Sequence, residues 1–227
     1  MSVGVSSYDL ISTPLREVNQ ALHGHGISGE VEITNPRGAH SVAVGINAPI
    51  KVTVNGHCGY YAAGMNQKAE VTVIGNVGTG VAENMMSGVV HVTGSASQSA
   101  GATGVGGLLV IDGNAGARCG ISMKGIDIVV GGDIGHMSAF MAQAGRLVVR
   151  GDAGDALGDS IYEARIYLQG TAKSLGADCV EKEMRPEHLE ELAGLLKTAG
   201  HPDDDPASYK RFGSARTLYH FHADNSY

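Results

Sequence analysis

Tryptophan is absent from this chain of 227 residues, and cysteine, proline and aromatic residues are scarce, with three cysteines, six prolines and 5% aromatics. Cys58, Cys119 and Cys179 lie about 60 residues apart and do not show the spacing of an iron–sulfur motif. We therefore expect three buried or reduced thiols, as in a cytoplasmic protein.

Charged residues are also few, at 17%, and the formal net charge is −7. An acidic balance argues against binding to nucleic acid or to an anionic membrane. The first residues lack the basic and then apolar pattern of a secretory signal. Residues 84–111 carry no Asp, Glu, Lys or Arg, but small and polar residues interrupt the stretch, which argues against a membrane span. These features predict a cytoplasmic location.

Glycine is abundant, with 34 residues, and many of the glycines are periodic. Seven recur at intervals of 19 residues: Gly56, Gly75, Gly94, Gly113, Gly132, Gly151 and Gly170. The residues four and two places before each are aliphatic, as in Val52 and Val54. Seven places after each stands another very small residue: Ala63, Ala82, Gly101, Gly120, Ala139, Gly158 and Ala177. A fixed period of this kind indicates a repeat architecture.

The repeat predicts an all-β fold, a right-handed parallel single-stranded β-helix of about seven or more coils. Alternating aliphatics indicate a strand with one buried face, and the glycine after them indicates a corner with a sharp turn or a positive φ. A unit of 19 residues is too short for a strand plus a crossover helix, which needs about 30 residues. The small residue seven places on predicts a second tight corner.

The two ends of the chain depart from the repeat, so we divide it into four parts. Residues 1–30 form an N-terminal cap with a short helix, in which Thr13 is the N-cap and Pro14 the first helical residue. Residues 31–180 form the β-helix. Residues 181–200 hold a helix from Pro186 to a stop at Gly200, and both helices are expected to cover open ends of the column. Residues 201–227 form an extended aromatic tail.

Two sets of residues point to a partner surface. Three places before the later repeat glycines, the side chains that should face outward are apolar, and an exposed apolar strip usually has a cover. The tail is rich in aromatics that have no obvious core to enter. The candidate partner contacts are Val110, Val129, Val148, Tyr167, Tyr209, Phe212, Tyr219 and Phe221. Whether the cover of the strip is the chain's own C-terminal helix or another subunit stays open, and the tail could also fold back on its own solenoid.

No catalytic, cofactor-binding or metal-binding residue is predicted. The loop Gly75–Gly80 is similar to a phosphate loop, but its glycines recur in every coil and no long helix follows. The histidine pairs at 23 and 25 and at 220 and 222 have no acidic or cysteine partners nearby. Three aspartates after repeat glycines, Asp133, Asp152 and Asp155, are expected to bond local backbone, with a calcium ladder as the alternative.

Coils such as Gly75-Asn-Val-Gly, Gly113-Asn-Ala-Gly, Gly132-Asp-Ile-Gly and Gly151-Asp-Ala-Gly resemble the glycine-repeat (GXGXG) domain at the C-terminal end of the large subunit of glutamate synthase. The resemblance covers roughly residues 30–180. The same β-helix occurs in subunits of formylmethanofuran dehydrogenase and of a formyltransferase/hydrolase complex. The exit from Ala177 to Met184, the segment Arg185-Pro-Glu-His-Leu and the segment Tyr219-His-Phe-His are most similar to the free-standing β-helix subunit of N-methylglutamate synthase.

This resemblance implies a non-catalytic scaffold subunit of a complex in methylamine metabolism. The complex, a transferase with an oxidoreductase-like synthase core, would interconvert glutamate plus methylamine with N-methylglutamate plus ammonia. It implies an amidotransferase-like partner and a synthase partner that carries FMN and an iron–sulfur cluster, with no cofactor in this chain. The alternatives are the equivalent subunit of a formylmethanofuran-type complex and a stand-alone solenoid enzyme that modifies acyl groups or sugars.

Overall fold

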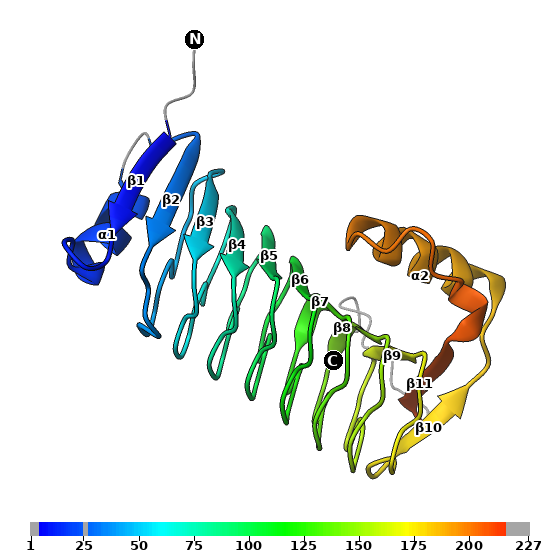
Figure 1. Ribbon diagram of the computed structural model, residues 1–227. Helices are drawn as coiled ribbons and strands as arrows, with labels where there is room; N and C mark the ends of the chain where they lie inside the picture. Colours follow the sequence, from blue (N-terminus) through cyan, green and yellow to red (C-terminus); the bar gives the residue numbers. More distant parts are fainter. Residues whose placement is uncertain (1–4, 25–26, 217–227) are drawn as a thin grey trace, which may run out of the picture.

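The computed structural model describes residues 5–24 and 27–216, which form a β-solenoid of about seven turns with two α-helices (Figure 1). Nine parallel strands stack along the rod, and two further strands close its C-terminal end. The parallel strands are β1 (Val5–Asp9), β2 (Glu30–Thr34), β3 (Lys51–Asn55), β4 (Glu70–Ile74), β5 (Val89–Val92), β6 (Leu108–Ile111), β7 (Lys124–Val130), β8 (Ala144–Val149) and β9 (Arg165–Leu168). The predicted parallel β-solenoid is confirmed.

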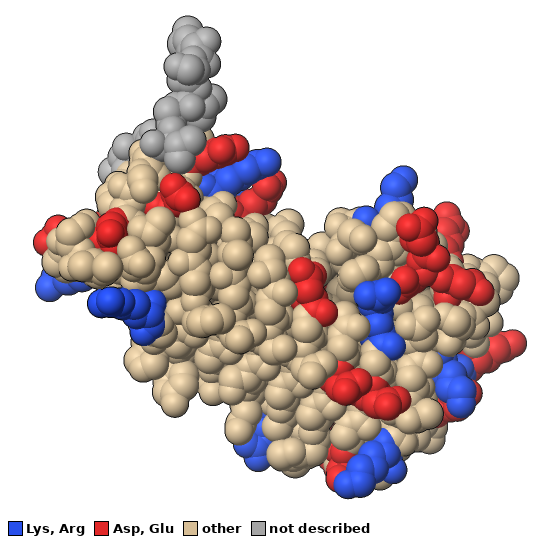
Figure 2. All heavy atoms as spheres, viewed as in Figure 1, with Lys and Arg blue, Asp and Glu red and all other residues tan. Residues whose placement is uncertain are grey.

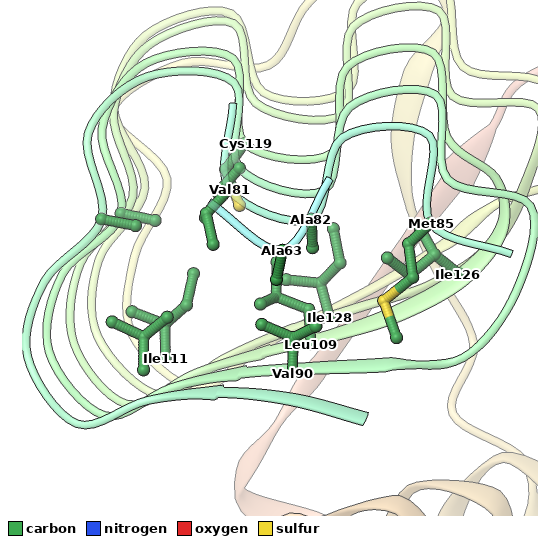
Figure 3. Close-up of a cluster of buried hydrophobic side chains, with 14 of the residues drawn as sticks. Ala63, Val81, Ala82, Met85, Val90, Leu109, Ile111, Cys119, Ile126 and Ile128 are labelled. Carbon is green, nitrogen blue, oxygen red and sulfur yellow. The ribbon is translucent and has the colours of Figure 1, made fainter. Parts of the chain in front are cut away.

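The strands pair in register from coil to coil, so that like residues stack on like. Val52 pairs with Val71, and Leu109 pairs with Ile128. A second ladder of single bridges runs along the wall that follows the corner glycines, from Cys58 through Val77 to Ala172. Aliphatic side chains from these walls fill the column, as Figure 3 shows for Leu109 and Ile128 among others. The core inside the column is therefore one continuous stack.

The corner glycines are required for two different reasons. Gly56 and Gly75 have positive φ angles of 129° and 150°. The later ones do not, and at Gly132 a Cβ would lie 2.0 Å from Asn114 Oδ1 of the preceding coil. Close approach, and not the backbone angle, excludes a side chain at such positions. The predicted sharp corner is confirmed, and close approach between coils is a second reason for glycine there.

The second corner is also tight, as predicted. Ala63 and Ala82 have left-handed φ angles near 51° and 54°, and Gly101 has 66°. A Cβ on Gly101 would lie 2.5 Å from Ile128 Cδ1 in the core. Only small residues fit at this corner because a side chain here points into the column, where a larger one would overlap core atoms.

The N-terminal cap contains helix α1 (Leu15–Leu22), as predicted, and the unpredicted strand β1, which pairs with β2. The helix buries Val18 and Leu22 against the first coils. Its N-cap is Pro14, with no side-chain cap, so the prediction of Thr13 as N-cap was wrong by one residue. The extended ψ of 134° at Pro14 keeps that residue outside the helix.

The C-terminal part differs more from expectation. Helix α2 (Pro186–Thr198) has nearly the predicted bounds, and Gly200 follows it with a φ of 90°. However, α2 lies against the face of the sheet and not over its end (Figure 1). The end is instead covered by β11 (Lys210–Ser214), which pairs antiparallel with β9 and with β10 (Cys179–Lys182).

The predicted extended tail is therefore wrong for its described part. Residues 201–216 fold back through the short 3-10 helix η1 (Pro206–Ser208) into β11, and they bury Tyr209 and Phe212. An antiparallel strand satisfies the open edge of β9, which would otherwise present unpaired backbone groups. Residues 217–227, with Tyr219 and Phe221, lie outside the described part. Within residues 5–24 and 27–216, no helix is long and apolar enough to cross a membrane.

Candidate functional site

Helix α2 covers the outward apolar strip of the sheet. Leu192, Leu195 and Leu196 of the helix pack with Tyr209 in a second core cluster on the outside of the column. The strip residues in the same cluster are Leu108, Val110, Val129, Val148 and Tyr167. Val129, Val148 and Tyr167 have no exposed surface. The cover that the sequence left undecided is thus the chain's own helix.

This arrangement corrects six of the proposed partner contacts. Val110, Val129, Val148, Tyr167, Tyr209 and Phe212 are all buried inside the chain. Phe212 of β11 packs into the core of the column, and the other five pack in the cluster under α2, so none of the six is presented to another protein. Tyr219 and Phe221 lie outside the described residues, so their role as partner contacts stays a prediction.

A network of charged groups joins α2 to the sheet beside this apolar contact. Asp127, Arg146 and Arg165 lie side by side on β7, β8 and β9, because their positions are paired in the parallel register. Arg146 donates from both Nε and Nη2 to the Asp127 carboxylate, the Nε bond being 2.6 Å long. From α2, Glu191 receives a bond of 2.6 Å from the Tyr167 hydroxyl and one of 2.5 Å from Arg165.

The network keeps Glu191 ionised at neutral pH. Burial alone would raise the pKa of Glu191, but the bonds from Tyr167 and Arg165 and the charges of Arg165 and Arg146 lower that pKa below its usual value. For Tyr167, burial and then the bond to Glu191 raise the pKa well above its ordinary value, so this phenol remains protonated. Glu191 therefore links the helix to two arginines and one tyrosine of the sheet.

A second ion pair holds the segment that follows α2. Arg150 donates to both oxygens of Asp204, at 2.7 and 3.1 Å, and the Tyr209 hydroxyl donates to the same carboxylate at 2.9 Å. Burial would raise the pKa of Asp204, yet the bonds from Arg150 and Tyr209 lower it. Bidentate pairs of this kind fix orientation as well as supplying energy.

Beside the network lies an open groove of about 900 Å³, with basic walls. Six cationic side chains line it, against three acidic ones, Asp127, Glu163 and Glu191. The cations are Arg146, Arg165, Lys182, Arg185, Arg211 and Arg216. Figure 2 shows that charged side chains gather towards the two ends of the visible face, while the middle coils are largely uncharged. We call the groove lined by these six cations the basic groove.

The groups that could do covalent chemistry are not activated. Cys58, Cys119 and Cys179 are buried free thiols. Burial raises the pKa of Cys58 and of Cys119 to about 12, and that of Cys179 to about 11. A thiol becomes a nucleophile only as its thiolate, so these three are unreactive at neutral pH.

Two of the aspartates that were singled out bond backbone, but in the next coil. Asp133 and Asp152 accept from backbone amides of that coil, at 2.8 and 2.7 Å, and not from local backbone as predicted. They belong to a row of polar side chains, repeated every coil, that tie each coil to the next at the corner: His57, Asn76, Ser95, Asn114, Asp133 and Asp152.

The remaining candidates also serve the stack of coils. Asp155 accepts a bond of 2.7 Å from Lys173 on the next coil, so the prediction of local backbone bonding was wrong here as well. His23 bonds the Val44 carbonyl at 2.7 Å. Within residues 5–24 and 27–216, no three His, Cys, Asp or Glu side chains are grouped so as to hold a metal ion.

The basic groove and the ion pairs were not predicted, although part of the signal was present. Asp127, Arg146 and Arg165 follow one another at the repeat interval of 19 residues, which would have placed them on neighbouring strands. Glu191 and Arg211 lie outside the repeat, so their positions depend on how α2 and β11 fold back. No periodic pattern locates such residues.

Comparison with known proteins gives an informative match. Over 221 residues the chain is 65% identical to Protein GlxC of Rhizobium meliloti (strain 1021), covering 96% of this chain and 97% of that protein. The chain belongs to the GlxC family. No family model matches the chain, and no solved structure matches it.

Proposed function

We propose that this chain is a non-catalytic scaffold subunit of a glutamate-synthase-like complex. The complex would be an N-methylglutamate synthase, which interconverts glutamate plus methylamine with N-methylglutamate plus ammonia. The partners are an amidotransferase-like subunit and a synthase subunit that carries FMN and an iron–sulfur cluster. The location of the complex is the cytoplasm. The proposal rests on the resemblance of the glycine repeat to the β-helix of glutamate synthase, and on the geometry described above.

One observation carries the scaffold role: the charged groups of the most polar region are used to hold the chain together. Arg146, Arg165 and Glu191 bond one another and neighbouring strands, and Arg150 bonds Asp204. A general acid or base needs a pKa near the working pH and access to a substrate. These groups have their pKa values displaced away from neutrality by the ion pairs. They stabilise a rigid shape, which is what a scaffold supplies.

Purification of the tagged full chain from its native host tests the proposal. Native mass spectrometry should show a hetero-oligomer, and an absorbance scan should show bound flavin in a partner. The isolated chain should not convert glutamate and methylamine. A partner that is a metallo-hydrolase without flavin would instead favour a formylmethanofuran-type complex. Turnover by the isolated chain would contradict the scaffold role.

A further inference from the structure

The basic groove contains two cations that form no ion pair with any described residue. Lys182 on β10 and Arg211 on β11 face each other in the antiparallel register. Arg211 donates from Nε to the Glu183 carbonyl at 3.0 Å. Among residues 5–24 and 27–216, no ion pair includes Lys182 or Arg211. The other four cations of the groove are each paired with acidic groups.

The environment of Arg211 is unfavourable for a cation on its own. Burial lowers the pKa of Arg211 most, and the charges of Arg165 and Arg185 also lower it. Tyr167 and the carboxylate of Glu187 act in the opposite direction but do not restore the ordinary value. Concentrating positive charge in this way costs free energy, and an anion in the groove would offset that cost. The chain as a whole is acidic, with a net charge of −7, so the concentration of cations is local and does not reflect composition.

The size and floor of the groove indicate what kind of anion fits. Arg146, Arg165, Arg211 and Lys182 stand on four successive strands of the sheet, β8, β9, β11 and β10. Arg146 is paired with Arg165, whereas Arg211 is paired with Tyr167 and with Lys182, so the cations form two pairs offset by two residues along the strands. At about 4.8 Å per strand this row of two pairs extends roughly 14 Å across the sheet, close to the length of four extended residues. Gly125, Gly145 and Gly213 line the same groove, so a backbone can approach closely where no side chain intervenes. A single carboxylate or phosphate would reach only part of this row.

We propose that the basic groove binds an extended acidic segment of a partner protein, with Lys182 and Arg211 as the central contacts. The segment presents carboxylates to the row of cations and lays its backbone over the glycines. The inference rests on the proposed scaffold role, because it assigns to the groove the contact with one of the partner subunits.

Binding of a model peptide tests the groove in the full chain. The probe is fluorescently labelled hexaglutamate, with hexalysine as the peptide of opposite charge, measured by fluorescence anisotropy at low salt. Lys182→Glu should weaken hexaglutamate binding about tenfold, and Lys182→Gln about threefold, as expected for charges a few Å apart near a surface. Lys68→Glu is the matched control, since Lys68 is an exposed lysine on an earlier coil. It should change the affinity less than twofold.

Each other outcome of this experiment overturns the inference. If hexaglutamate does not bind, or if Lys68→Glu weakens it as much as Lys182→Glu, the groove is not a specific site. If free glutarate displaces the peptide at the same carboxylate concentration, the groove binds a small anion and not an extended peptide segment.

The native complex separates this inference from the proposed function. Lys182→Glu should lower the amount of partner subunit that co-purifies at physiological salt at least fivefold, whereas Lys68→Glu should not. If wild-type chain forms a flavin-containing complex and Lys182→Glu forms it equally well, the groove inference is wrong and the scaffold role stands. If the wild-type chain forms no complex, the proposed function itself is wrong.

Discussion

The outward face of the sheet has two halves that share one backbone geometry and differ in what covers them. On β3, β4 and β5 the outward row holds Thr53, Thr72 and His91, all of which are partly exposed. On β6 to β9 the same row holds three valines and a tyrosine, which are buried under α2. The register is continuous across the boundary, so the side chains and not the backbone decide where the helix docks.

The difference shows that the outward face of one sheet can be a helix-docking surface in one half and an open surface in the other. Inside the column every coil needs the same aliphatic residues, because each coil must stack on the next. Outside it the repeat imposes no such demand, and the row can change from threonine to valine without disturbing the stack. The covered half anchors a helix and its ion pairs, while the open half keeps a polar sheet surface.

The largest effect is expected from removing the cover. Leu192→Glu places a charge where Leu192 is fully buried against the strip, which costs several kcal/mol, so α2 should undock while the rod stays folded. Cleavage by a protease between residues 183 and 216 should accelerate about 100-fold or more. Thr72→Glu on the open half should leave the cleavage rate unchanged. An equal acceleration by both variants would show that the two halves do not differ.

Corner glycines should matter equally in both halves. Gly75 lies in the open half and Gly132 in the covered half, and a Cβ at either would lie within 3.0 Å of atoms in the preceding coil. Substitution of either glycine by valine should lower the free energy of unfolding by about 3 kcal/mol. Urea denaturation measures both. A change below about 0.5 kcal/mol at either position would contradict the close approach at that corner.

Shortening a side chain in the outward row should lower the free energy of unfolding more in the covered half than in the open half. Val148→Ala removes two methyl groups from a fully buried site and should cost about 2 kcal/mol. Thr72→Ala removes a partly exposed side chain and should cost less than about 0.5 kcal/mol. Urea denaturation of both variants provides the comparison. Similar costs at the two positions would indicate that α2 contributes little to the packing of its half.

The smallest expected effect is a dependence of α2 docking on pH. The folded-state pKa of Glu191 is lowered, so the stabilisation by its charge is present above its ordinary pKa and is lost as pH falls through the lowered value. The protease protection of α2 should thus decline from about pH 4.5 downward. Glu191→Gln should be cleaved faster than the wild-type chain at pH 7, and the difference should shrink towards pH 3. If the difference in cleavage rate between Glu191→Gln and the wild-type chain grew as pH fell, the stabilising role of the Glu191 charge would be contradicted.

The sequence predicted the strands and corners that the repeat controls, but not the polar contacts that the same repeat places between coils. The strands, the buried aliphatic pairs and both corners follow from the interval of 19 residues, because every coil meets the same neighbours. The same interval separates Asp127, Arg146 and Arg165, which therefore lie on neighbouring strands. The prediction of local turn bonding for Asp133 was wrong because side chains of the polar row, such as Asn114 and Asp133, each reach the next coil.

The parts outside the repeat could not be placed in the same way. Lys210–Ser214 shows no alternation of apolar and polar residues, and it becomes strand β11 because the edge of β9 offers unpaired backbone groups. The position of α2 depends on the connection after β10 and on the valines it meets. Such contacts join residues far apart in the chain, so a local sequence pattern does not predict them.

Accessibility of single cysteines tests the division of the sheet face most directly. The native thiols are buried with raised pKa values, so a maleimide should label them slowly and leave an engineered cysteine distinct. Thr72→Cys and Val129→Cys occupy the same outward row, at a partly exposed position on β4 and a fully buried one on β7. The account predicts rapid labelling at position 72 and at least 100-fold slower labelling at position 129. Equal rates at the two positions would show that α2 does not cover the sheet, and would contradict the account.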